Sequence, residues 1–462
     1  MEISLIIAVA AVAIFSIFIT PKAKSNGAFF NGLSPKGKPP GLLMLTFSQV
    51  TTWIFARSLL NAAILGFYYG IWGTVAYATY YLSFLTGAKI IDSVRFKHGF
   101  GSIQAFLTDR FGQWGTQCYN FVVGIRLVSE VFANILVIGI LFGVAGSGSY
   151  TLAVALFAIV TLVYSMLGGL HASLRTDLFQ MILFLIVLTA LTILVLTTGH
   201  LNTATLMFKS FTITDPGPIL ILVALLQVWS YPMHDPVMMD RGFLADRETT
   251  RKSFHHAAWI SATCIIIFGS FGIVAGANAS SGETMNQVLM RLLGENPMLL
   301  FNITLVISAM STLDSTLSSA SKLVAVDMKW IEPSRTNGRI TMAVFVMLGL
   351  LLVFWGNKDL FSAVAVSGTA SMYLAPVIFF SLWGNRTDIP LWSYLGSFAI
   401  AIAGAALYFT ESAGHSQLLG ESHKYTKLLF ISLTVLVGGC LLFWAGMVSP
   451  KQQPRFSSTT TG

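Results

Sequence analysis

The sequence predicts an all-α membrane protein of about thirteen transmembrane helices, in which two blocks of five helices form an inverted repeat between one leading and two trailing helices. Composition is the first reason, because 55% of the 462 residues are hydrophobic, only 10% are charged, and the mean hydropathy is +0.75. Such a chain has too little polar surface to cover a soluble globule. The second reason is that apolar runs of about 20 residues, enough to cross about 30 Å of hydrocarbon, recur along the whole chain. The third is that two of these runs contain polar residues at mid-span.

The apolar runs set the order of the predicted elements. They cover residues 2–20, 42–65, 68–91, 116–145, 150–168, 173–198, 217–233, 256–278, 299–326, 337–356, 360–382, 391–410 and 427–448. The first run and the loop after it form a leading unit at 1–40. Five spans follow at 41–198, then a polar connection at 199–216, five more spans at 217–382, and two trailing helices with a short tail at 383–462. Because each block has an odd number of spans, the two blocks run in opposite directions across the membrane.

Basic residues predict the orientation of these spans. With the N-terminus outside, most of the 27 Lys and Arg residues fall on the cytoplasmic side, whereas the external segments hold Lys209, Arg291, Lys358, Lys424 and Lys427. The positive-inside rule therefore predicts a multi-pass protein of the cell membrane with an external N-terminus and a cytoplasmic C-terminus. The net charge of +8 then reflects loops that face the lipid bilayer, and no nucleic-acid partner is needed to explain it.

Other partners and covalent chemistry have little support in the sequence. Cys118, Cys264 and Cys440 are few, odd in number and predicted within helices, which argues against a disulfide framework. Because the sequence has no Walker loop, nucleophile elbow or His/Cys metal cluster, we expect that the protein is not an enzyme. The HDP motif at 234–236 and the pair His255–His256 are expected to be solvated, in or beside a basic loop. No obligate protein partner is evident.

Two predicted spans have polar residues near their middle, where the neighbouring spans are apolar. LLMLTFSQVTTWIF at 42–55 opens the first block, and ILVALLQVWSYPMHD at 221–235 opens the second. Polar backbone at that depth must line protein or a wet cavity. In inverted-repeat transporters the first helix of each half is broken at the bilayer midplane, where it contributes to the binding site. The alternative is that both stretches are polar patches that hold helices together.

Four stretches resemble, in order and spacing, the sodium/solute symporter family, which includes bacterial symporters of proline, galactose, pantothenate and sialic acid. They are RFKHGFGSIQAFLTDRFG at 95–112, YSMLGGLHASLRTDLFQMILF at 164–184, HDPVMMDRGFLADRETTRKSF at 234–254 and SAMSTLDSTLSSAS at 308–321. The resemblance covers roughly residues 40–330, and hydropathy alone supports it beyond them. It implies a LeuT-type transporter fold, sodium as the coupling ion and a small organic solute as the cargo.

The last of these stretches contains a predicted sodium site. Ser308, Ser311 and Thr312 are spaced i, i+3 and i+4, so they share one helical face. Their hydroxyl oxygens, together with backbone carbonyls, are ligands that suit a hard monovalent cation. The resemblance implies that main-chain carbonyls matching Phe47 and Val50 complete this site. The alternative is that the hydroxyls only bond back to carbonyls of their own helix.

A carboxylate departs from the family pattern, because Asp314 stands where relatives have a small polar residue. An unpaired charge at bilayer depth costs at least about 2.5 kcal/mol. Asp177 matches the family's acidic residue near the ion exit, and some relatives hold a second sodium between the two helices concerned. We therefore expect Asp177, Asp314 and Ser315 to form a second cation site or a proton-carrying site. The alternative is that Asp314 pairs with a basic residue such as Lys322, or is protonated.

Buried charges and aromatic residues suggest a site for a carboxylate-bearing solute. Arg57 follows Trp53 by one turn, and Arg126 and Glu130 form an i, i+4 pair at similar depth. The residues expected to enclose the solute are Gln49, Trp53, Arg57, Glu130, Gln227, Trp229 and Tyr231. Bidentate and aromatic contacts of this kind recognise small carboxylates. The alternative is that Arg57, Arg126 and Glu130 neutralise one another as a structural triad.

These expectations combine into sodium-coupled symport of a small organic solute by alternating access. Sodium bound between spans 42–65 and 299–326 would favour the outward-open state, and solute bound at the midplane would allow external closure. Coupling to protons is an alternative. A sensor built on a transporter fold is another, although only KQQPRFSSTTTG follows the last predicted helix. A channel would need a continuous polar pathway, and the sequence supplies one central polar region instead.

Overall fold

The computed structural model describes residues 2–34, 36–355 and 366–448, and these ranges contain helices and loops but no strand. The helices up to the middle of the chain are α1 (Glu2–Ile19), α2 (Asn26–Asn31), α3 (Leu42–Trp53), α4 (Ala56–Thr79), η1 (Tyr80–Leu82), α5 (Ser83–Ile91), η2 (Asp92–Lys97), α6 (Ile103–Phe142), α7 (Gly148–Thr197) and α8 (Thr203–Leu206). The later helices are α9 (Pro216–Gln227), η3 (Tyr231–His234), α10 (Pro236–Gly242), α11 (Arg247–Ala277), α12 (Met285–Leu293), α13 (Glu295–Lys322), η4 (Leu323–Asp327), α14 (Arg335–Trp355), η5 (Ser371–Tyr373), α16 (Leu374–Pro376), η6 (Val377–Trp383), α17 (Leu391–Ser412) and α18 (Lys424–Val448).

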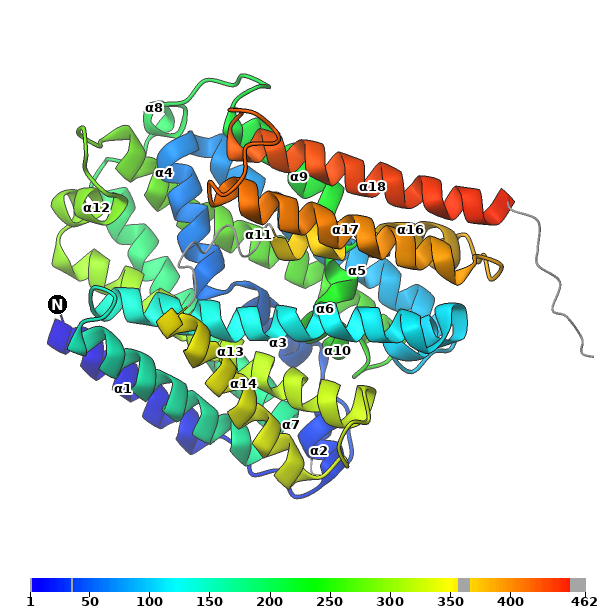
Figure 1. Cartoon of the computed structure of the whole chain (residues 1–462). Coiled ribbons are helices and arrows are strands. Elements are labelled where there is room, and N and C mark those ends of the chain that lie inside the picture. Colours follow the sequence, from blue (N-terminus) through cyan, green and yellow to red (C-terminus); the bar gives the residue numbers. More distant parts are fainter. Residues whose placement is uncertain (1, 35, 356–365, 449–462) are drawn as a thin grey trace, which may run out of the picture.

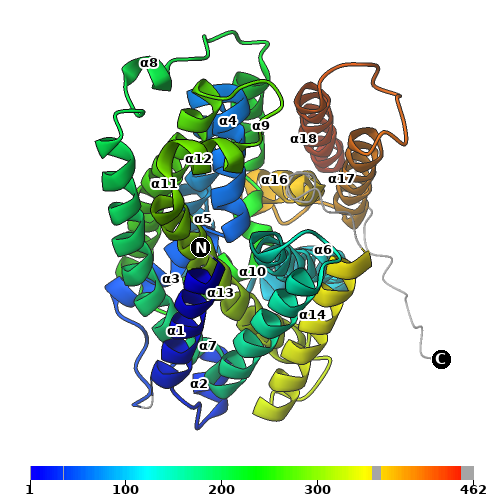
Figure 2. The same cartoon turned by 90° about the vertical axis from the view of Figure 1, so that its left-hand side faces the viewer.

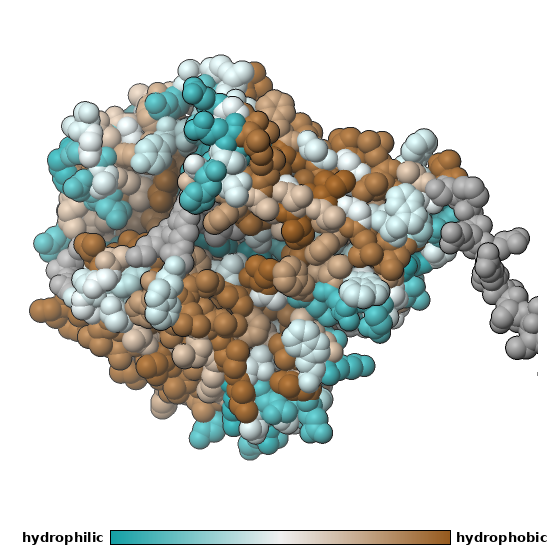
Figure 3. Space-filling model, in the orientation of Figure 1, coloured by the Kyte–Doolittle hydropathy of each residue, from teal (hydrophilic) through white to brown (hydrophobic). Residues whose placement is uncertain are grey.

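Length and hydropathy identify the membrane-spanning helices. Within the described ranges nine helical segments are long and apolar enough to cross a membrane, and α1 and α9 are shorter apolar helices. Hydrophilic residues gather over α8 and α12 on one side of the molecule and around α2 on another, whereas the surface over α1 is hydrophobic (Figure 3). The predicted all-α membrane fold is confirmed, and the number of thirteen spans stays a prediction. Part of the run at 360–382 and most of the tail lie outside the described residues.

Glycine allows one of the long helices to contain two spans. At 1.5 Å per residue the 50 residues of α7 would form a rod of about 75 Å, more than twice the thickness of the hydrocarbon. The helix is interrupted at Gly169, where φ is +55°, and a Cβ there would lie 2.4 Å from the Phe29 carbonyl oxygen. L-residues avoid this backbone region. The interruption therefore separates the two spans predicted at 150–168 and 173–198.

Both helices predicted to be broken are broken. α3 ends at Trp53, Ile54 and Phe55 have non-helical backbone angles, and α4 begins at Ala56. In the second case α9 ends at Gln227, the short helix η3 follows, and α10 begins at Pro236 after the extended residue Asp235. Such breaks leave backbone groups that neighbouring helices must satisfy.

The broken helices lie inside the bundle, where they position the candidate sites. α13 crosses the centre and packs against α3, α4, α6 and α7 (Figures 1 and 2). α11 packs along α4 and α3, and the trailing helices α17 and α18 pack against each other at one side. The Lys427 ammonium donates to the Glu411 carboxylate at 2.6 Å and so ties these two trailing helices together. The polar middle of α13 is thereby surrounded by protein on every side.

Candidate cation and solute sites

The first candidate site lies where the break after α3 meets the middle of α13. The Ser308 hydroxyl donates to the Ile54 carbonyl, and the Thr312 hydroxyl lies 3.4 Å from the Thr51 carbonyl. A cavity of about 10 Å³ opens here, lined by Thr51, Ile54, Met181, Phe184, Ile307 and Ser308. A single water-sized particle needs about 10–15 Å³. Thr51, Ile54 and Ser308 line this space, and the Thr312 hydroxyl lies next to it at the Thr51 carbonyl; carbonyl and hydroxyl oxygens of this kind suit a sodium ion.

The carbonyls at this site come one helical turn later than those predicted. The Val50 carbonyl accepts the backbone N–H of Ile54 at 2.9 Å, and the Phe47 carbonyl accepts the Thr51 hydroxyl at 2.9 Å. Both are therefore engaged within the α3 segment, whereas the carbonyls of Thr51 and Ile54 face α13. The i, i+3 spacing expected of the carbonyl pair is kept. The shift arises because the helix breaks at the apolar pair Ile54–Phe55, which has no polar residue to mark it.

Ser311, the third residue of the predicted sodium face, points to a neighbouring group. Its hydroxyl donates to Asp177 Oδ1 at 2.6 Å, while the Ser48 hydroxyl of α3 donates to Asp177 Oδ2 at 2.6 Å. The Ser173 and Ser315 hydroxyls lie 2.8 Å apart beside the same carboxylate. These residues, together with Asp314, Thr176 and Arg241, are called the acidic cluster below. The structure thus brings the predicted Asp177, Asp314 and Ser315 together.

Arg241 supplies the cationic group of the acidic cluster. Its Nη2 donates to Ser315 Oγ at 2.8 Å and lies 3.5 Å from Asp177 Oδ2, and its Nε donates to Ser48 Oγ at 3.1 Å. The side chain is fully buried. The positive-inside assignment places Arg241 in a cytoplasmic loop, and this placement is wrong because α10 carries the side chain into the bundle. The positive charge of the guanidinium partly compensates the negative charges of Asp177 and Asp314. The sequence analysis expected a bound cation or a proton to neutralise them.

Asp314 accepts hydrogen bonds from hydroxyl groups. Thr176 Oγ1 donates to its Oδ2 at 2.7 Å, and Ser315 Oγ lies 3.4 Å from its Oδ1. The proposed alternative pairing with Lys322 is wrong, since the Lys322 ammonium donates to Asp240 at 2.7 Å and to Asp327 at 2.9 Å. The acidic cluster therefore holds two carboxylates and one guanidinium, all of them nearly or fully buried.

A second cavity, of about 20 Å³, lies on the other side of the α3–α4 break. Its lining is almost entirely aromatic and consists of Trp53, Phe55, Arg57, Ser58, Tyr77, Tyr80, Tyr81 and Tyr231. The tyrosine hydroxyls mostly bond to protein: Tyr77 donates to Ser58, Tyr80 to Gln227, and Tyr81 to the Trp53 carbonyl. These bonds fix the rings in place. The cavity is closed in this conformation and has room for about one water molecule.

Arg57 brings an incompletely paired charge to this cavity. Its guanidinium is 1% exposed and lies 5.5 Å from the centre of the Phe55 ring. The nearest carboxylate atom is Glu130 Oε1, 3.9 Å from Nη2, and neither Nε nor Nη1 has a hydrogen-bond partner among the described residues. A buried guanidinium with unused donors costs free energy until an anion or another acceptor reaches it.

Arg126, in contrast, is held between two carboxylates. Its Nη2 pairs with Glu130 and donates to Asp235 Oδ2 at 2.9 Å, and Trp53 Nε1 donates to the same Asp235 oxygen at 3.1 Å. Asp235 also caps α10 by accepting the Met238 N–H at 3.0 Å. Asp235 and His234 are fully buried, so the expectation that the HDP motif is solvated is wrong. Arg126 and Glu130 thus form a structural charge group with Asp235. Arg57 contacts this group only through Glu130, at 3.9 Å.

The remaining residues of the predicted solute site are placed differently. Trp53 and Tyr231 line the aromatic cavity. Gln49 is fully buried, and its amide has no partner among the described residues. Gln227 accepts from Tyr80 and lies 3.4 Å from the hydroxyls of Thr369 and Ser432. Trp229 is 38% exposed and packs against Phe379 and Trp383, apart from the cavity.

The sequence analysis did not identify Tyr77, Tyr80, Tyr81, Asp235 or Arg241 as site residues. The tyrosines had a usable signal, because Tyr77, Tyr80 and Tyr81 are spaced i, i+3 and i+4 and must share one face of a helix. Asp235 and Arg241 had a weaker signal, because they lie in a stretch whose proline and charges look like a loop. The chain break after α9 was predicted, and the residues directly following such a break were the ones to examine.

Comparison with known proteins supports the fold. No protein-family model and no curated protein matches the chain. A Na⁺-coupled sialic acid symporter, solved in a substrate-bound outward-open state, aligns with a TM-score of 0.71 over 97% of this chain and 98% of that one, at 14% identity. Mhp1, a transporter of the nucleobase-cation-symport-1 family solved in a closed conformation with bromovinylhydantoin, aligns with a TM-score of 0.57 over 94% and 96%, at 14% identity.

A third similar structure is that of a manganese transporter from Eremococcus coleocola, with a TM-score of 0.51 over 93% of this chain and 98% of that one, at 10% identity. These similarities extend over nearly the whole chain, although the sequences have diverged far. The chain therefore has the LeuT fold, the all-α membrane fold of the sodium symporters to which it is similar.

Proposed function

We propose that the protein is a secondary active transporter that couples sodium to the movement of a small organic solute. The observation that carries this proposal is the set of four oxygens from Thr51, Ile54, Ser308 and Thr312, which joins a broken helix to α13. An ion bound there links two elements and can shift the balance between conformations that differ in their separation. The sodium coupling of structurally similar symporters supports the same reading.

The arrangement gives each group a role in alternating access. Ser308 and Thr312 would bind sodium and hold α13 against the broken helix, which favours the state open to the sodium-rich side. The aromatic cavity beside Arg57 would open and receive the solute from that side. Closure then requires both ligands, and loss of sodium to the cytoplasm releases the solute. For this cycle we propose the predicted units 41–198 and 217–382 as the inverted repeats, with the N-terminus outside.

The solute is proposed to carry a carboxylate or a similar anionic group. Arg57 is the reason, because its Nε and Nη1 have no acceptor among the described residues and its Nη2 lies 3.9 Å from Glu130 Oε1. A carboxylate can pair with two neighbouring donors along one edge of a guanidinium. The aromatic walls suit a solute with an apolar or planar body. Gln49, whose buried amide also has no described partner, is a second candidate for contact with the solute once the cavity opens.

The acidic cluster supports a second coupled cation. Asp177 and Asp314 carry two negative charges against the single positive charge of Arg241, so a net buried charge of one remains if both carboxylates are ionised. Such a charge is tolerated only when a cation or a proton neutralises it. We propose a second sodium or a proton at Asp314, and coupling to protons in place of sodium is the second candidate function on the same observation.

Uptake into proteoliposomes tests the proposal. Radiolabelled amino acids, sugars and carboxylates are offered with an inward sodium gradient, with an inward proton gradient, and with potassium alone. The proposal expects a carboxylate-bearing solute to accumulate above its external concentration with the sodium gradient. Accumulation with the proton gradient alone would favour the second candidate. No accumulation of any solute with either gradient, from protein that binds sodium, would contradict symport.

A further inference from the structure

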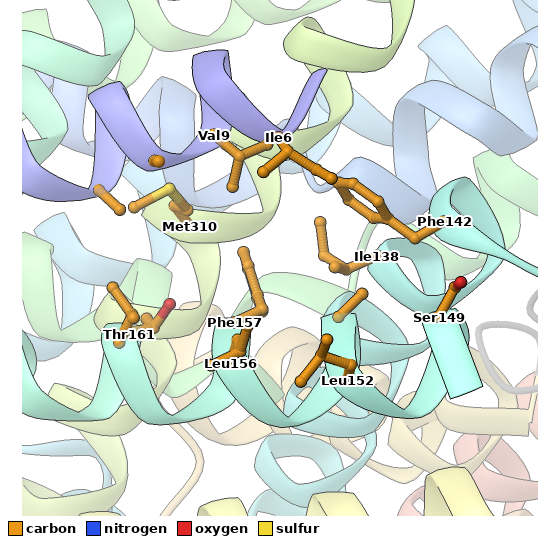
Figure 4. Close-up of a pocket in the computed structure, with 14 residues that line it drawn as sticks. Ile6, Val9, Ile138, Phe142, Ser149, Leu152, Leu156, Phe157, Thr161 and Met310 are labelled. Atoms are coloured by element: carbon orange, nitrogen blue, oxygen red, sulfur yellow. The ribbon is translucent and has the colours of Figure 1, made fainter. Parts of the chain in front are cut away.

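Two lateral crevices of the bundle face the membrane. The first has a volume of about 340 Å³ and lies between α1, α6, α7 and α13. Its lining is apolar apart from Ser149 and Thr161, and Figure 4 shows Ile6, Leu156 and Met310 around it. No charged residue lines it. The second has a volume of about 500 Å³ and is lined by Phe47, Leu185, Leu188, Thr189, Thr192, Ile193, Trp259, Ile260, Thr263, Cys264 and Ile267.

The second crevice opens where α7 and α11 diverge over α3. α3 packs against both of these helices, and Figure 2 shows the three side by side. Its mouth is exposed, since Ile193 of α7 is 56% and Trp259 of α11 is 59% exposed, while Cys264 at its floor is buried. Because α7 and α11 are membrane-spanning segments, the mouth opens to hydrocarbon. Its volume lies within the range of about 300–1,000 Å³ found for small-ligand pockets.

Cationic and hydrogen-bonding side chains continue the crevice toward the start of α11. Lys252, His256, Ile260, Thr263 and Ile267 follow one another at spacings of three or four residues, so they form one stripe along the helix. Lys252 and His256 are exposed. From Lys252 to Ile267 the stripe extends about 22 Å, at 1.5 Å per residue. An apolar crevice therefore ends, on one helix face, in a polar surface that has one cationic side chain, Lys252.

Lys252 and His256 each have a hydrogen-bond donor that a ligand could use. Lys252 bonds to Glu248 at 2.6 Å, but both are exposed, and exposed pairs of this kind hold weakly. His256 Nδ1 accepts a hydrogen bond from Trp259 Nε1 at 3.2 Å, so the proton of the neutral imidazole is on Nε2, which is left to donate. The same bond holds the Trp259 ring at the mouth of the crevice, and indole rings are enriched near membrane interfaces.

We infer that this second crevice is a binding site for an anionic phospholipid, with an acyl chain between α7 and α11 and the phosphate headgroup at Lys252 and His256. An acyl chain fits the apolar lining, and a headgroup with net negative charge complements the cationic end. In the proposed orientation this is a lipid of the cytoplasmic leaflet. The site would contact Phe47, which precedes the Ser48 that bonds to Asp177, so the bound lipid would touch the helix that carries the cation sites.

Quenching of Trp259 fluorescence by brominated lipids tests this inference without any transport measurement. The whole protein is reconstituted in phosphatidylcholine nanodiscs that contain a small fraction of brominated phosphatidylglycerol or, in parallel, of brominated phosphatidylcholine. The Trp259 contribution is the difference between the protein and its Trp259→Phe variant. We expect half-maximal quenching at a severalfold lower mole fraction of phosphatidylglycerol than of phosphatidylcholine, because each basic residue near the surface strengthens binding about fivefold.

Matched variants assign the preference to the crevice. Lys252→Gln with His256→Gln should abolish the preference for phosphatidylglycerol, measured against quenching by phosphatidylcholine in the same variant, because His256 also holds the Trp259 ring. Lys22→Gln with Lys24→Gln removes two exposed basic residues between α1 and α2 and should leave the preference intact. Thr189→Leu with Thr192→Leu, which fills the crevice, should reduce quenching by both lipids. Equal quenching by the two lipids, or a preference that survives the Lys252 and His256 changes, would overturn the inference.

Discussion

Arg57 and Asp314 are buried ionisable side chains whose partners among the described residues leave their charge incompletely compensated. Arg57 lies 3.9 Å from one carboxylate, which Arg126 already engages, and Asp314 accepts from hydroxyls. Most buried charges elsewhere in the described chain have an ion pair at hydrogen-bond distance, as Lys322 has with Asp240. Because burying an uncompensated charge costs free energy, a bound ligand of opposite charge would stabilise the protein at these two positions.

Changing Arg57 tests the solute site. Arg57→Gln should raise the solute dissociation constant about tenfold to a hundredfold, since hydrogen bonds to charged groups contribute about 1.5–3 kcal/mol. Arg57→Lys keeps the charge but not the fork and should bind with intermediate affinity. Isothermal titration of purified protein with the transported solute measures both. Sodium-induced conformational change should persist in Arg57→Gln, and unchanged solute affinity in that variant would place Arg57 in a purely structural group.

Arg126 provides the contrasting case within the same charge group. Removing it strands Glu130 and Asp235 without their shared partner, so Arg126→Gln should destabilise the fold by about 3–5 kcal/mol. Thermal unfolding in detergent would show this as a lower midpoint than that of Arg57→Gln. A midpoint equal to that of the unsubstituted protein would contradict the structural role assigned to Arg126.

Asp314 tests the number of coupled ions. Asp314→Ser keeps a hydroxyl on the same helix face but removes the charge that a second cation or a proton would neutralise. The number of cations moved per solute should therefore fall by one, while the first sodium site and basic transport remain. Reversal potentials of solute-coupled current give this ratio for both proteins. The same ratio in the variant would mean that Asp314 is a structural residue that carries no coupled ion.

In the proposed transport cycle, the broken α3–α4 helix and α13 together form the element that would link ion binding to solute binding. Ile54 contributes a carbonyl on the side of Ser308, and Phe55 and Arg57 follow it on the side of the aromatic cavity. Only a few residues thus separate the two candidate sites along the chain. A helix that is continuous here would bond these carbonyls internally and leave no oxygens for an ion.

Removing the hydroxyls on α13 tests the first sodium site. Ser308→Ala with Thr312→Val preserves the shape of the helix face and should raise the sodium concentration for half-maximal uptake at least tenfold, about 1.4 kcal/mol. Ser318→Ala is the matched control, because the Ser318 hydroxyl donates to the Asp314 carbonyl of its own helix at 2.9 Å. Sodium-dependent uptake assays compare the three proteins. Equal sodium dependence in all of them would rule out the site between Thr51, Ile54 and α13.

Gly169 tests the turn between the two spans of α7. Gly169→Ala should destabilise the protein by about 1–3 kcal/mol, because it places a Cβ at positive φ and against the Phe29 carbonyl. Gly124→Ala in α6 meets no atom within 4 Å and should be neutral or slightly stabilising. Chemical denaturation in detergent measures both. A Gly169→Ala variant as stable as the Gly124→Ala variant would contradict a backbone role for Gly169.

Sequence predicted elements better than it predicted contacts between them. Hydropathy is set by each segment alone, so the apolar runs and the two broken helices could be predicted, although the break after Trp53 was not itself located. The register at that break depends on packing against α13, which a sequence does not show. The carbonyls of Thr51 and Ile54 face α13, whereas the predicted pair was Phe47 and Val50. Arg241 escaped notice because a charged residue beside a proline-rich stretch has the composition of a loop, and only packing shows that α10 turns inward.

The molecule as a whole is a bundle with an apolar exterior around a polar centre. Hydroxyls and charges gather on α3, α10 and α13, all enclosed by other helices. Such polar groups at membrane depth are expensive, so a chain that places them together around two small cavities has the organisation of a transporter core. Composition could predict this exterior and the presence of a polar centre, but not which charges in the centre pair with each other, because such pairs join residues far apart in the chain, 64 positions for Asp177 and Arg241 and 109 for Arg126 and Asp235.

Reciprocal coupling tests the central claim most directly. Proteoliposomes containing the protein are given an inward gradient of the transported solute with equal sodium on both sides, and the entry of ²²Na⁺ is followed. If solute and sodium move together, the solute gradient must drive net sodium entry, and Ser308→Ala with Thr312→Val must abolish that entry at low sodium. Solute entry that is undiminished yet carries no ²²Na⁺ would contradict sodium-coupled symport by this protein.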